Sequence, residues 1–390
     1  MSKQSDEVIR VVKKYWYMVA LALIVLIALW YRLGIIDSYI IPTYGNTMYH
    51  VGIERETILT QYYPTTELSY GGGFPNFYVP AYRLLIVSMC VATGIDPMIM
   101  SGLMTIVLGI MVLLVLYVLA YRLSNNLYVA LFAAFFFIMS PDITIYTMRP
   151  LPEILGLFLV PFTLLFVIRE DWWLASICAA ITALTHQMTL LTLVAVIGTY
   201  MLFQLIRAAW QYYKDRKDRE AFMKPLRTVL GCLAPIFVAC LTYAAWLVYS
   251  TGSVNIMSIA QVTNHEGNQV DVALFLRVGV FVLIFTVIGL FFLGDKLFSR
   301  PGEPKDPKGE YGLSTSVDSL LLIGAWALIT LLLTFNDKIF YIFPDHKFLI
   351  FPNFMDRYLT FFAQICVIIA AYGVYAVLRA VDLDILREKP

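Results

Sequence analysis

Charge is what this 390-residue sequence has least of: aspartate, glutamate, lysine and arginine together make up 14% of it. A soluble domain carries about 25% charged and about 45–50% apolar residues. Here 60% of the residues are hydrophobic. They form continuous runs of about 17–25 residues, not the alternating segments of a β-barrel. The composition excludes a soluble globular protein and predicts an all-α, polytopic membrane protein.

Cysteine is also scarce, and the chain has only five. All of them lie in apolar runs, and none belongs to a Cys-x-x-Cys or a Cys/His pair: Cys90, Cys178, Cys232, Cys240 and Cys366. We expect them to be small buried hydrophobic residues.

Several functional classes lack support in this sequence. A net charge of +1 gives no electrostatic basis for binding nucleic acid. The chain contains no P-loop, no dinucleotide-binding glycine fingerprint, no Ser-His-Asp signature and no His-Glu-x-x-His pair. Nucleotide chemistry in the cytosol is therefore not indicated.

Ten membrane spans are predicted when the longest apolar run is divided in two. The run from 172 to 205 exceeds one span and carries a polar break, Thr185-His186-Gln187, near its middle. The predicted spans are 15–35, 98–121, 127–139, 153–168, two within 172–205, 228–249, 272–293, 319–335 and 358–378. Residues 1–390 then form a single transmembrane domain.

A long polar and aromatic interval, 36–97, follows the first span directly. Ordering a loop of this size is costly unless the loop has a function. Two amphipathic helices are expected within it, at 47–62 and 77–94. The second could be an eleventh span, but Pro75, Pro80 and Arg83 at its start favour a helix that lies along the membrane surface.

Positive charge is unevenly distributed among the connections. With the N-terminus inside and 77–94 not crossing, most of the 28 lysines and arginines fall on inside segments. The positive-inside rule then places both termini and the basic loops 207–227 and 295–317 in the cytoplasm. The interval 36–97 faces outward from the cell membrane, and a site built on it would do the same.

The first candidate site is the run Gly45-Asn46-Thr47-Met48-Tyr49-His50, which presents polar tips just before the 47–62 helix. His50 and Glu54 are four residues apart, so on a helix they share one face. A plain structural reading stays open, because Asn46 would also serve as a helix cap.

Three further groups are predicted to gather at the same outer face. Arg149 and Glu153 flank the start of the fourth span, where the helix dipole alone would also favour a carboxylate. His186 lies at the break in the 172–205 run, where a structural histidine is the alternative. Asp356 and Arg357 open the last span, and a guanidinium suits phosphate, although an interfacial anchor fits too. Polar groups are expensive at membrane depth, so their convergence indicates a site.

The order of these features resembles the GT-C superfamily of membrane glycosyltransferases, which includes the oligosaccharyltransferase catalytic subunit and the protein O-mannosyltransferases. The run 45–50 resembles that family's first motif, and Arg149…Glu153 resembles its second. Gly73-Phe74-Pro75 is similar to the entry to the second of its two jaw helices, and Asp356-Arg357-Tyr358 to its late outer arginine. The resemblance implies that 47–62 and 77–94 are jaw helices in a large first outer loop.

The resemblance also implies an activity: transfer of a sugar from a polyprenyl-phosphate donor to a lipid, glycan or protein acceptor, by inverting displacement among the membrane lipids. Glu153 or Glu54 would deprotonate the acceptor. Donor phosphate would be bound by Arg357, helped by Arg149. The implied catalytic group is Glu153, Glu54, Asn46 and His50, and the substrate-positioning group is His186, Tyr49 and Asp356.

One departure from the family pattern keeps other functions open. Asn46 stands where the family usually has an aspartate, and an amide is neither a general base nor a carboxylate ligand. The usual Asp-x-Asp pair is absent too, so no cofactor is expected and a divalent metal (Mg or Mn) is without support. The alternatives are a catalytically inactive binding or scaffold subunit and a transporter or flippase of lipid-linked sugars. Against a transporter, the sequence shows no repeat symmetry and no paired broken helices.

Overall fold

The computed structural model describes residues 3–38, 46–67, 73–76, 78–216, 218–252, 270–298, 315–336 and 355–381. Within these ranges the regular secondary structure is helical apart from one short antiparallel pairing of β1 (Thr66–Glu67) with β2 (Phe74–Pro75). The predicted all-α class is confirmed.

Most helices follow the predicted apolar runs, and short polar side chains set their first turns. They are α1 (Lys3–Asp37), α4 (Pro97–Ser124), α5 (Leu127–Met139), α7 (Pro152–Ile168), α8 (Trp172–Ala183), α9 (Gln187–Lys214), α10 (Arg219–Thr251), α14 (Val317–Thr334) and α16 (Met355–Ala380). Asp96 caps α4 by accepting from the amide of Met98, and Asn126 caps α5 in the same way. The two helices of the outer interval are α2 (Asn46–Thr60) and α3 (Ala81–Thr93), close to their predicted positions.

Three connections differ from expectation. The predicted loop 140–152 contains a short helix, α6 (Pro141–Thr147), bent by 73° from α5. The predicted span 272–293 is broken into α12 (Val272–Leu276) and α13 (Val280–Phe298). The break falls at Gly279, whose φ of +110° disfavours any residue with a side chain. The basic segment 207–227 is mostly helical, because α9 and α10 both extend into it.

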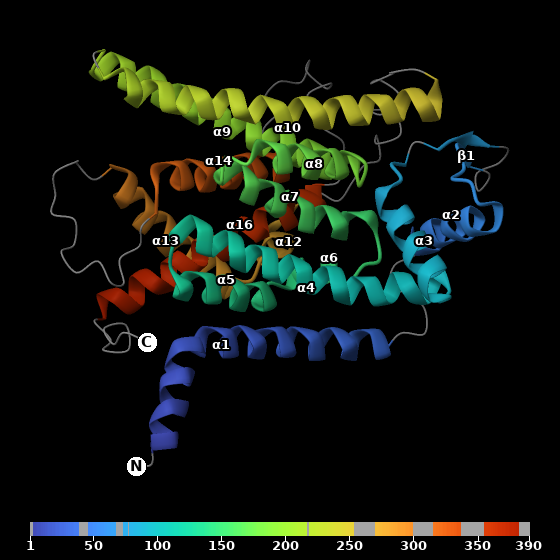
Figure 1. The fold of residues 1–390 in the computed structure, drawn as a ribbon, viewed down its shortest axis with the longest axis horizontal. Helices are drawn as coiled ribbons and strands as arrows, with labels where there is room; N and C mark the ends of the chain where they lie inside the picture. The colour runs from blue at the N-terminus through green and yellow to red at the C-terminus, as the bar shows by residue number, and fades with distance from the viewer. Residues whose placement is uncertain are drawn as a thin grey trace.

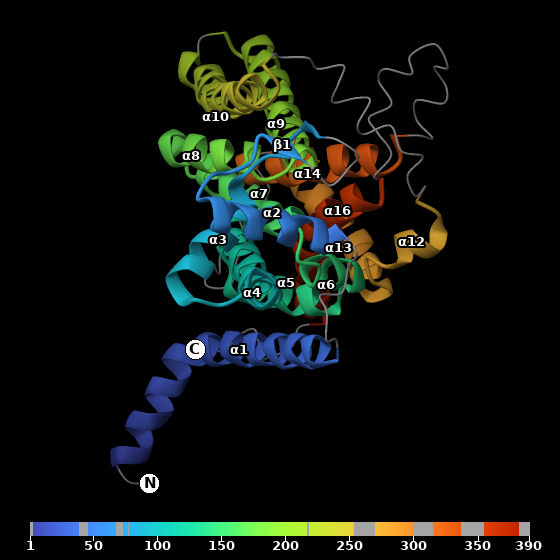
Figure 2. The same ribbon diagram turned by 90° about the vertical axis from the view of Figure 1, so that its right-hand side faces the viewer.

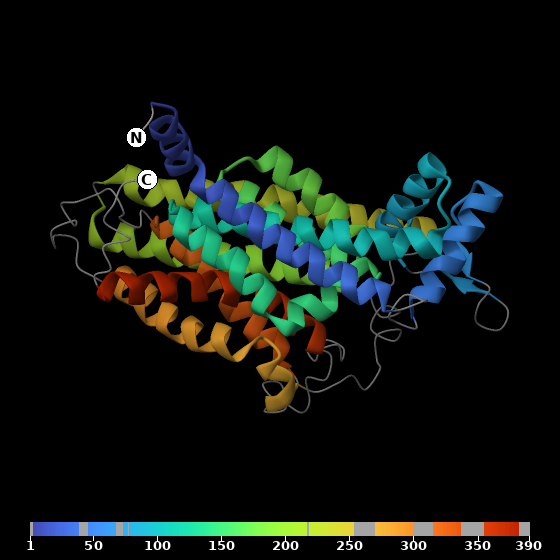
Figure 3. The same cartoon turned by 90° about the horizontal axis from the view of Figure 1, so that it is seen from below.

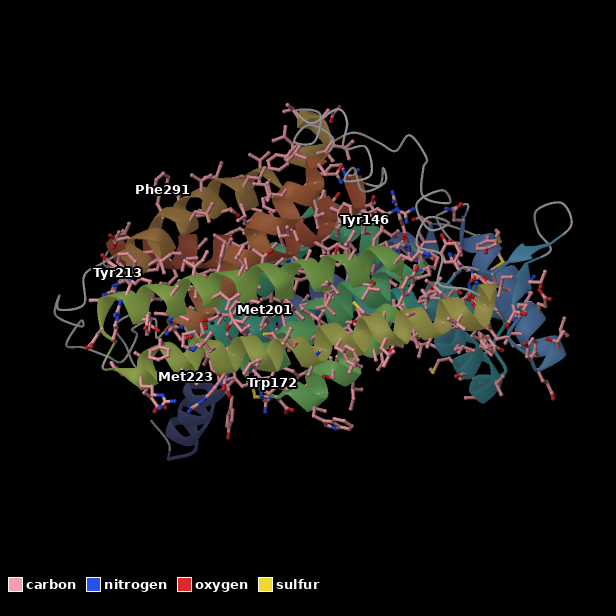
Figure 4. The ribbon with its side chains drawn as sticks, turned by 90° about the horizontal axis from the view of Figure 1, so that it is seen from above. Tyr146, Trp172, Met201, Tyr213, Met223 and Phe291 are labelled. Atoms are coloured by element: carbon pink, nitrogen blue, oxygen red, sulfur yellow. The ribbon has the colours of Figure 1, made fainter. Side chains whose placement is uncertain are left out.

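The number of spans is not confirmed as ten. Six described helices are long and apolar enough to cross a membrane, or seven if the bent pair of α5 and α6 counts as one span: α1 from Tyr15, α4, α9, α10, α14 and α16. The segments α3, α7, α8 and α13 are apolar but shorter. Large apolar side chains also cover the outside; Tyr213 and Phe291 are 81% and 76% exposed (Figure 4). The chain is a multi-pass membrane protein.

The helices form an elongated bundle around α16 (Figures 1 and 3). Almost four fifths of the apolar window of α16 is buried, against 11% for α1, which lies along one side. Two glycines let α13 and α16 approach closely. A Cβ added to Gly373 would lie only 3.0 Å from the amide nitrogen of Gly289. At one end lie α2, α3 and the β pairing, and at the other lie the α9–α10 connection and the last turn of α16 (Figure 1).

A buried arginine holds the peripheral α1 against the bundle. Arg32 is 2% exposed and donates to the carbonyl and the hydroxyl of Thr147, at 3.1 and 2.6 Å. A Cβ added to Gly109 would lie only 2.6 Å from the guanidinium carbon of Arg32. The glycine in α4 therefore makes room for the cation that joins α1 to the end of α6.

Candidate functional site

The jaw helices α2 and α3 are joined to each other through a buried arginine. Arg83, in the first turn of α3, is fully buried, and its Nε donates to His50 Nδ1 at 3.0 Å. Its Nη1 donates to the hydroxyl of Tyr63 at 3.0 Å and to Asn76 Oδ1 at 3.4 Å. The sequence suggested that Arg83 marks a surface-lying helix; the side chain is instead the polar centre of the jaw pair.

Two neighbouring aromatic rings lie beside the same guanidinium. Its carbon lies 4.9 Å from the ring centre of Tyr49 and 5.0 Å from that of Tyr78, within the range of cation–π attraction. The ring of His50 lies 5.2 Å from both tyrosine rings. The candidate residues Tyr49 and His50 are thus part of one packed unit with Arg83.

A second set of polar residues comes from three helix ends. Glu153 follows Pro152 in the first turn of α7, where proline is well tolerated, and its Oε1 forms an ion pair with Arg357 Nη1. Oε1 also lies 3.6 Å from His186 Nε2. His186 caps α9, because its Nδ1 accepts from the amide of Met188 at 3.3 Å, and this bond turns Nε2 toward Glu153.

Tyr78 connects the two sets. Its ring contacts His50 on one side and lies 6.4 Å from the ring of His186 on the other. The amide of Ala81, at the start of α3, also donates to the carbonyl of Leu184 in the α8–α9 connection at 2.8 Å. We call the combined group the polar cluster: His50, Arg83, Glu153, His186 and Arg357. Two of its members belong to α2 and α3, which lie with β1 at one end of the bundle (Figure 2).

The polar cluster carries an excess of positive charge. Burial and the neighbouring Arg83 hold the pKa of His50 well below its usual value. Burial also lowers the pKa of His186, although Glu153 opposes the shift. Both imidazoles are therefore neutral at neutral pH, which leaves two guanidinium groups against one carboxylate. Such a site attracts an anion.

Glu54 lies apart from this cluster. It shares a face of α2 with His50, as predicted, but one turn further along it contacts α4, where Ser101 Oγ donates to its Oε2 at 3.3 Å. Its side chain is fully buried, and its Oε1 and the hydroxyl of Tyr82 have no hydrogen-bond partner among the described residues. Burial raises the pKa of Glu54 to about 8, against the opposing effects of Arg83 and Ser101.

The other candidate residues lie outside the polar cluster or outside the described side chains. Asn46 is the first residue of α2 and is exposed. Arg149 lies in the turn between α6 and α7, with its guanidinium 4.5 Å from the ring centre of Tyr146. Asp356 belongs to α16, and its side chain is not among those described.

Sequence reasoning missed a second buried carboxylate, Asp142. It accepts from the hydroxyl of Thr360 at 2.6 Å and pairs with Arg277 at 2.7 Å. Thr360 follows Arg357 by one helical turn, so Asp142 and Glu153 both face the same side of α16. The sequence did contain a signal for this carboxylate, because Pro141-Asp142 lies directly after the predicted span 127–139. In the described ranges no three His, Cys, Asp or Glu side chains form a group that could hold a metal ion.

Comparisons with known proteins identify the fold. No family profile and no curated protein matches the sequence. Among solved structures, the oligosaccharyltransferase AglB of Archaeoglobus fulgidus, in complex with an inhibitory peptide and a dolichol-phosphate, is similar with a TM-score of 0.64 and 12% identity. The match covers 96% of this chain and 52% of AglB. The apo form gives the same TM-score, at 13% identity over 95% of this chain and 52% of AglB.

A bacterial structure gives the same result. ArnT of Cupriavidus metallidurans, bound to undecaprenyl phosphate, is similar with a TM-score of 0.57 and 14% identity, over 93% of this chain and 60% of ArnT. AglB and ArnT are both GT-C glycosyltransferases. The chain thus has the GT-C fold, as the sequence resemblance predicted, and spans about half to three fifths of the length of these proteins.

Proposed function

We propose that this chain is a membrane glycosyltransferase that moves a sugar from a polyprenyl-phosphate donor to an acceptor at the outer membrane face. One observation carries the proposal: within a fold shared with AglB and ArnT, the buried polar cluster lies beside the jaw helices and has an excess of positive charge. The solved structures of those two proteins hold dolichol-phosphate and undecaprenyl phosphate, which are both lipid phosphates.

Arg357 is the proposed donor-phosphate ligand. Arg357 lies in the first turn of α16, and its guanidinium presents several N–H donors in a geometry suited to phosphate. In the structure it is paired with Glu153. A phosphate that binds Arg357 would compete for this guanidinium and weaken its hold on the carboxylate. Donor binding would thereby make Glu153 a stronger base.

Glu153 is the proposed general base. The acceptor hydroxyl gives its proton to the carboxylate while its oxygen forms a bond to the anomeric carbon of the sugar. The bond from that carbon to the phosphate oxygen breaks, and the polyprenyl phosphate leaves with the electron pair. His186 Nε2, beside Oε1, would orient the carboxylate.

Glu54 and Asn46 are less suited to proton transfer. Glu54 is sealed against α4 and, at neutral pH, already protonated, so it cannot accept a proton. Asn46 is exposed but carries an amide. We therefore assign the base to Glu153 and give Asn46 a role in contacting substrate.

The proposed orientation follows from charge. The basic segment 207–227 lies at the opposite end of the bundle from α2 and α3 (Figure 1). The positive-inside rule then puts that end in the cytoplasm and the polar cluster outside. An outer site would accept a lipid-, glycan- or protein-borne hydroxyl; the inhibitory peptide in the AglB complex favours a peptide.

The test is sugar release from a panel of polyprenyl-phosphate sugars by the purified full-length chain, alongside Glu153→Gln, Glu54→Gln and Asn46→Asp. We expect Glu153→Gln to lose about 10²–10⁴-fold in rate and Glu54→Gln to stay near wild type. Binding of the donor to Arg357→Ala, measured by titration, should be weaker. Unchanged donor affinity in Arg357→Ala would rule out that phosphate assignment. Activity in Asn46→Asp alone would identify an inactive relative instead of an enzyme.

A further inference from the structure

The bond between Arg83 and His50 determines which imidazole nitrogen can carry a proton. We propose that Arg83 is a positioning residue that fixes His50 as the Nε2–H tautomer, so that His50 permanently presents a hydrogen-bond donor to a sugar hydroxyl of the substrate. The identity of that substrate rests on the proposed function, whereas the tautomer does not.

His50 Nδ1 carries no proton in this structure. An arginine side chain is always protonated and can only donate, so a ring nitrogen that accepts from it carries no proton. Arg83 Nε lies 3.0 Å from His50 Nδ1, and both side chains are buried. A neutral His50 must therefore hold its single proton on Nε2.

The imidazole of His50 stays neutral. The charged and titratable groups that act on it are Arg83 from α3, Glu153 from α7, His186 from the α8–α9 connection and Arg357 from α16. Of these, only Glu153 favours the imidazolium, and it is already paired with Arg357. A doubly protonated ring would also place an N–H against the N–H of Arg83, so the geometry and the charges agree.

Arg83 cannot easily turn away from His50. Bonds to Tyr63 and Asn76 hold its Nη1, and the neighbouring rings of Tyr49 and Tyr78 both lie within cation–π range of its guanidinium. Giving up the contact with His50 would break this whole arrangement. The arginine is therefore a fixed donor that selects one imidazole tautomer, and the tautomer does not have to be selected by the substrate.

The remaining hydrogen-bond donor of His50 is Nε2–H. The two ring nitrogens point to opposite sides of the imidazole, so Nε2–H is directed away from Arg83. The structure gives it no acceptor among the described residues. Nε2–H is therefore available to donate to a ligand oxygen at this position. Arg357 already serves the phosphate in the proposed site, and a neutral N–H suits an uncharged sugar hydroxyl.

The experiment reads the tautomer directly. Long-range ¹⁵N–¹H spectra of the histidine-labelled full chain in micelles separate a protonated from an unprotonated ring nitrogen, and His50→Gln identifies which of the four signals belongs to His50. At pH 7 we expect a neutral ring with the proton on Nε2. A proton on Nδ1, or a doubly protonated ring, would overturn the proposal without any variant.

Variants then test the role of Arg83. In Arg83→Met the His50 signals should change toward a mixture of tautomers. Arg55→Met, which removes an exposed arginine of α2 paired with Asp96 at the start of α4, should leave them unchanged. If Arg83→Met does not fold, Tyr63→Phe removes one of its anchors more gently and should broaden the same signals. Unchanged signals in the folded Arg83 variant would refute the positioning role.

Transfer rates test the donor. His50→Phe, which lacks a donor, should lose about 10²–10³-fold, and His50→Gln, which keeps an N–H, should recover part of that loss. Equal rates for wild type and His50→Phe would overturn the donor role. A wild type with no transfer but with the expected tautomer would instead count against the proposed function.

Discussion

Glu54 offers a sharp test of the electrostatics inside the jaw pair. Replacing it with glutamine keeps the size of the side chain and mimics the protonated acid, but removes the titration. Because burial disfavours the carboxylate, the folded protein holds the proton until pH of about 8, whereas an unfolded chain releases it near 4.5. The substitution should therefore stabilise the protein in a pH-dependent manner.

The sign and size follow from linkage. Between pH 4.5 and 8 the folded protein binds one more proton than the unfolded chain, so its free energy of unfolding falls by about 1.4 kcal/mol per pH unit. The stability is fully present below about 4.5 and lost by about 8. Glutamine avoids this loss. Glu54→Gln should therefore exceed wild type by about 3 kcal/mol at pH 7 and about 5 kcal/mol above pH 8.

The assay is reversible unfolding in mixed micelles, followed by tryptophan fluorescence at pH 5.5, 6.5, 7.5 and 8.5. The difference between variant and wild type is the quantity of interest, since other titrating groups cancel in it. Ser101→Ala is the control, because it removes the hydrogen bond to Glu54 but leaves the acid in place. A difference that does not change with pH would refute the reasoning.

Two further substitutions test the contacts that hold the helices together. In Gly156→Ala the new Cβ would lie 2.7 Å from the Cβ of Thr189, in the first turn of α9. We expect about 1–3 kcal/mol of destabilisation, and slower sugar transfer because His186 at the start of α9 would be displaced. Gly102→Ala, whose new Cβ would have no neighbour within 4 Å, should be neutral or slightly stabilising in the same unfolding assay. Arg32→Met leaves the carbonyl at the end of α6 without its donor and should cost about 1–3 kcal/mol by denaturant titration. A midpoint equal to that of wild type would show that Arg32 does not anchor α1.

Much of the fold was predictable because helices in a membrane leave a strong local signal. The break at His186 is an example, since a polar interruption in an apolar run too long for one span could be identified without a structure. The positions of α2 and α3 followed from the polar interval after the first span. The number of spans was less predictable: helices such as α7 are buried among their neighbours, and the sequence does not distinguish such a helix from one that faces lipid.

The candidate site was predictable as a set of residues but not as a set of bonds. Glu153 and Arg357 were both expected at one face, yet 204 positions separate them and no local pattern announces their ion pair. Arg83 was misread because an arginine near a helix start usually extends into water, whereas here its side chain is buried and contacts two tyrosine rings and His50. Such contacts depend on how helices meet, which periodicity does not record.

The convergence of helix ends has a consequence for how the site responds to substitution. Glu153, His186 and Arg357 all lie at the first turn of a helix: α7, α9 and α16. Each such end carries about half a positive elementary charge from its aligned peptide groups. A lipid phosphate arriving here would feel a potential that belongs to the backbone and that no side-chain substitution removes. Individual polar side chains around this point can therefore be exchanged while the attraction for an anion persists in the backbone itself.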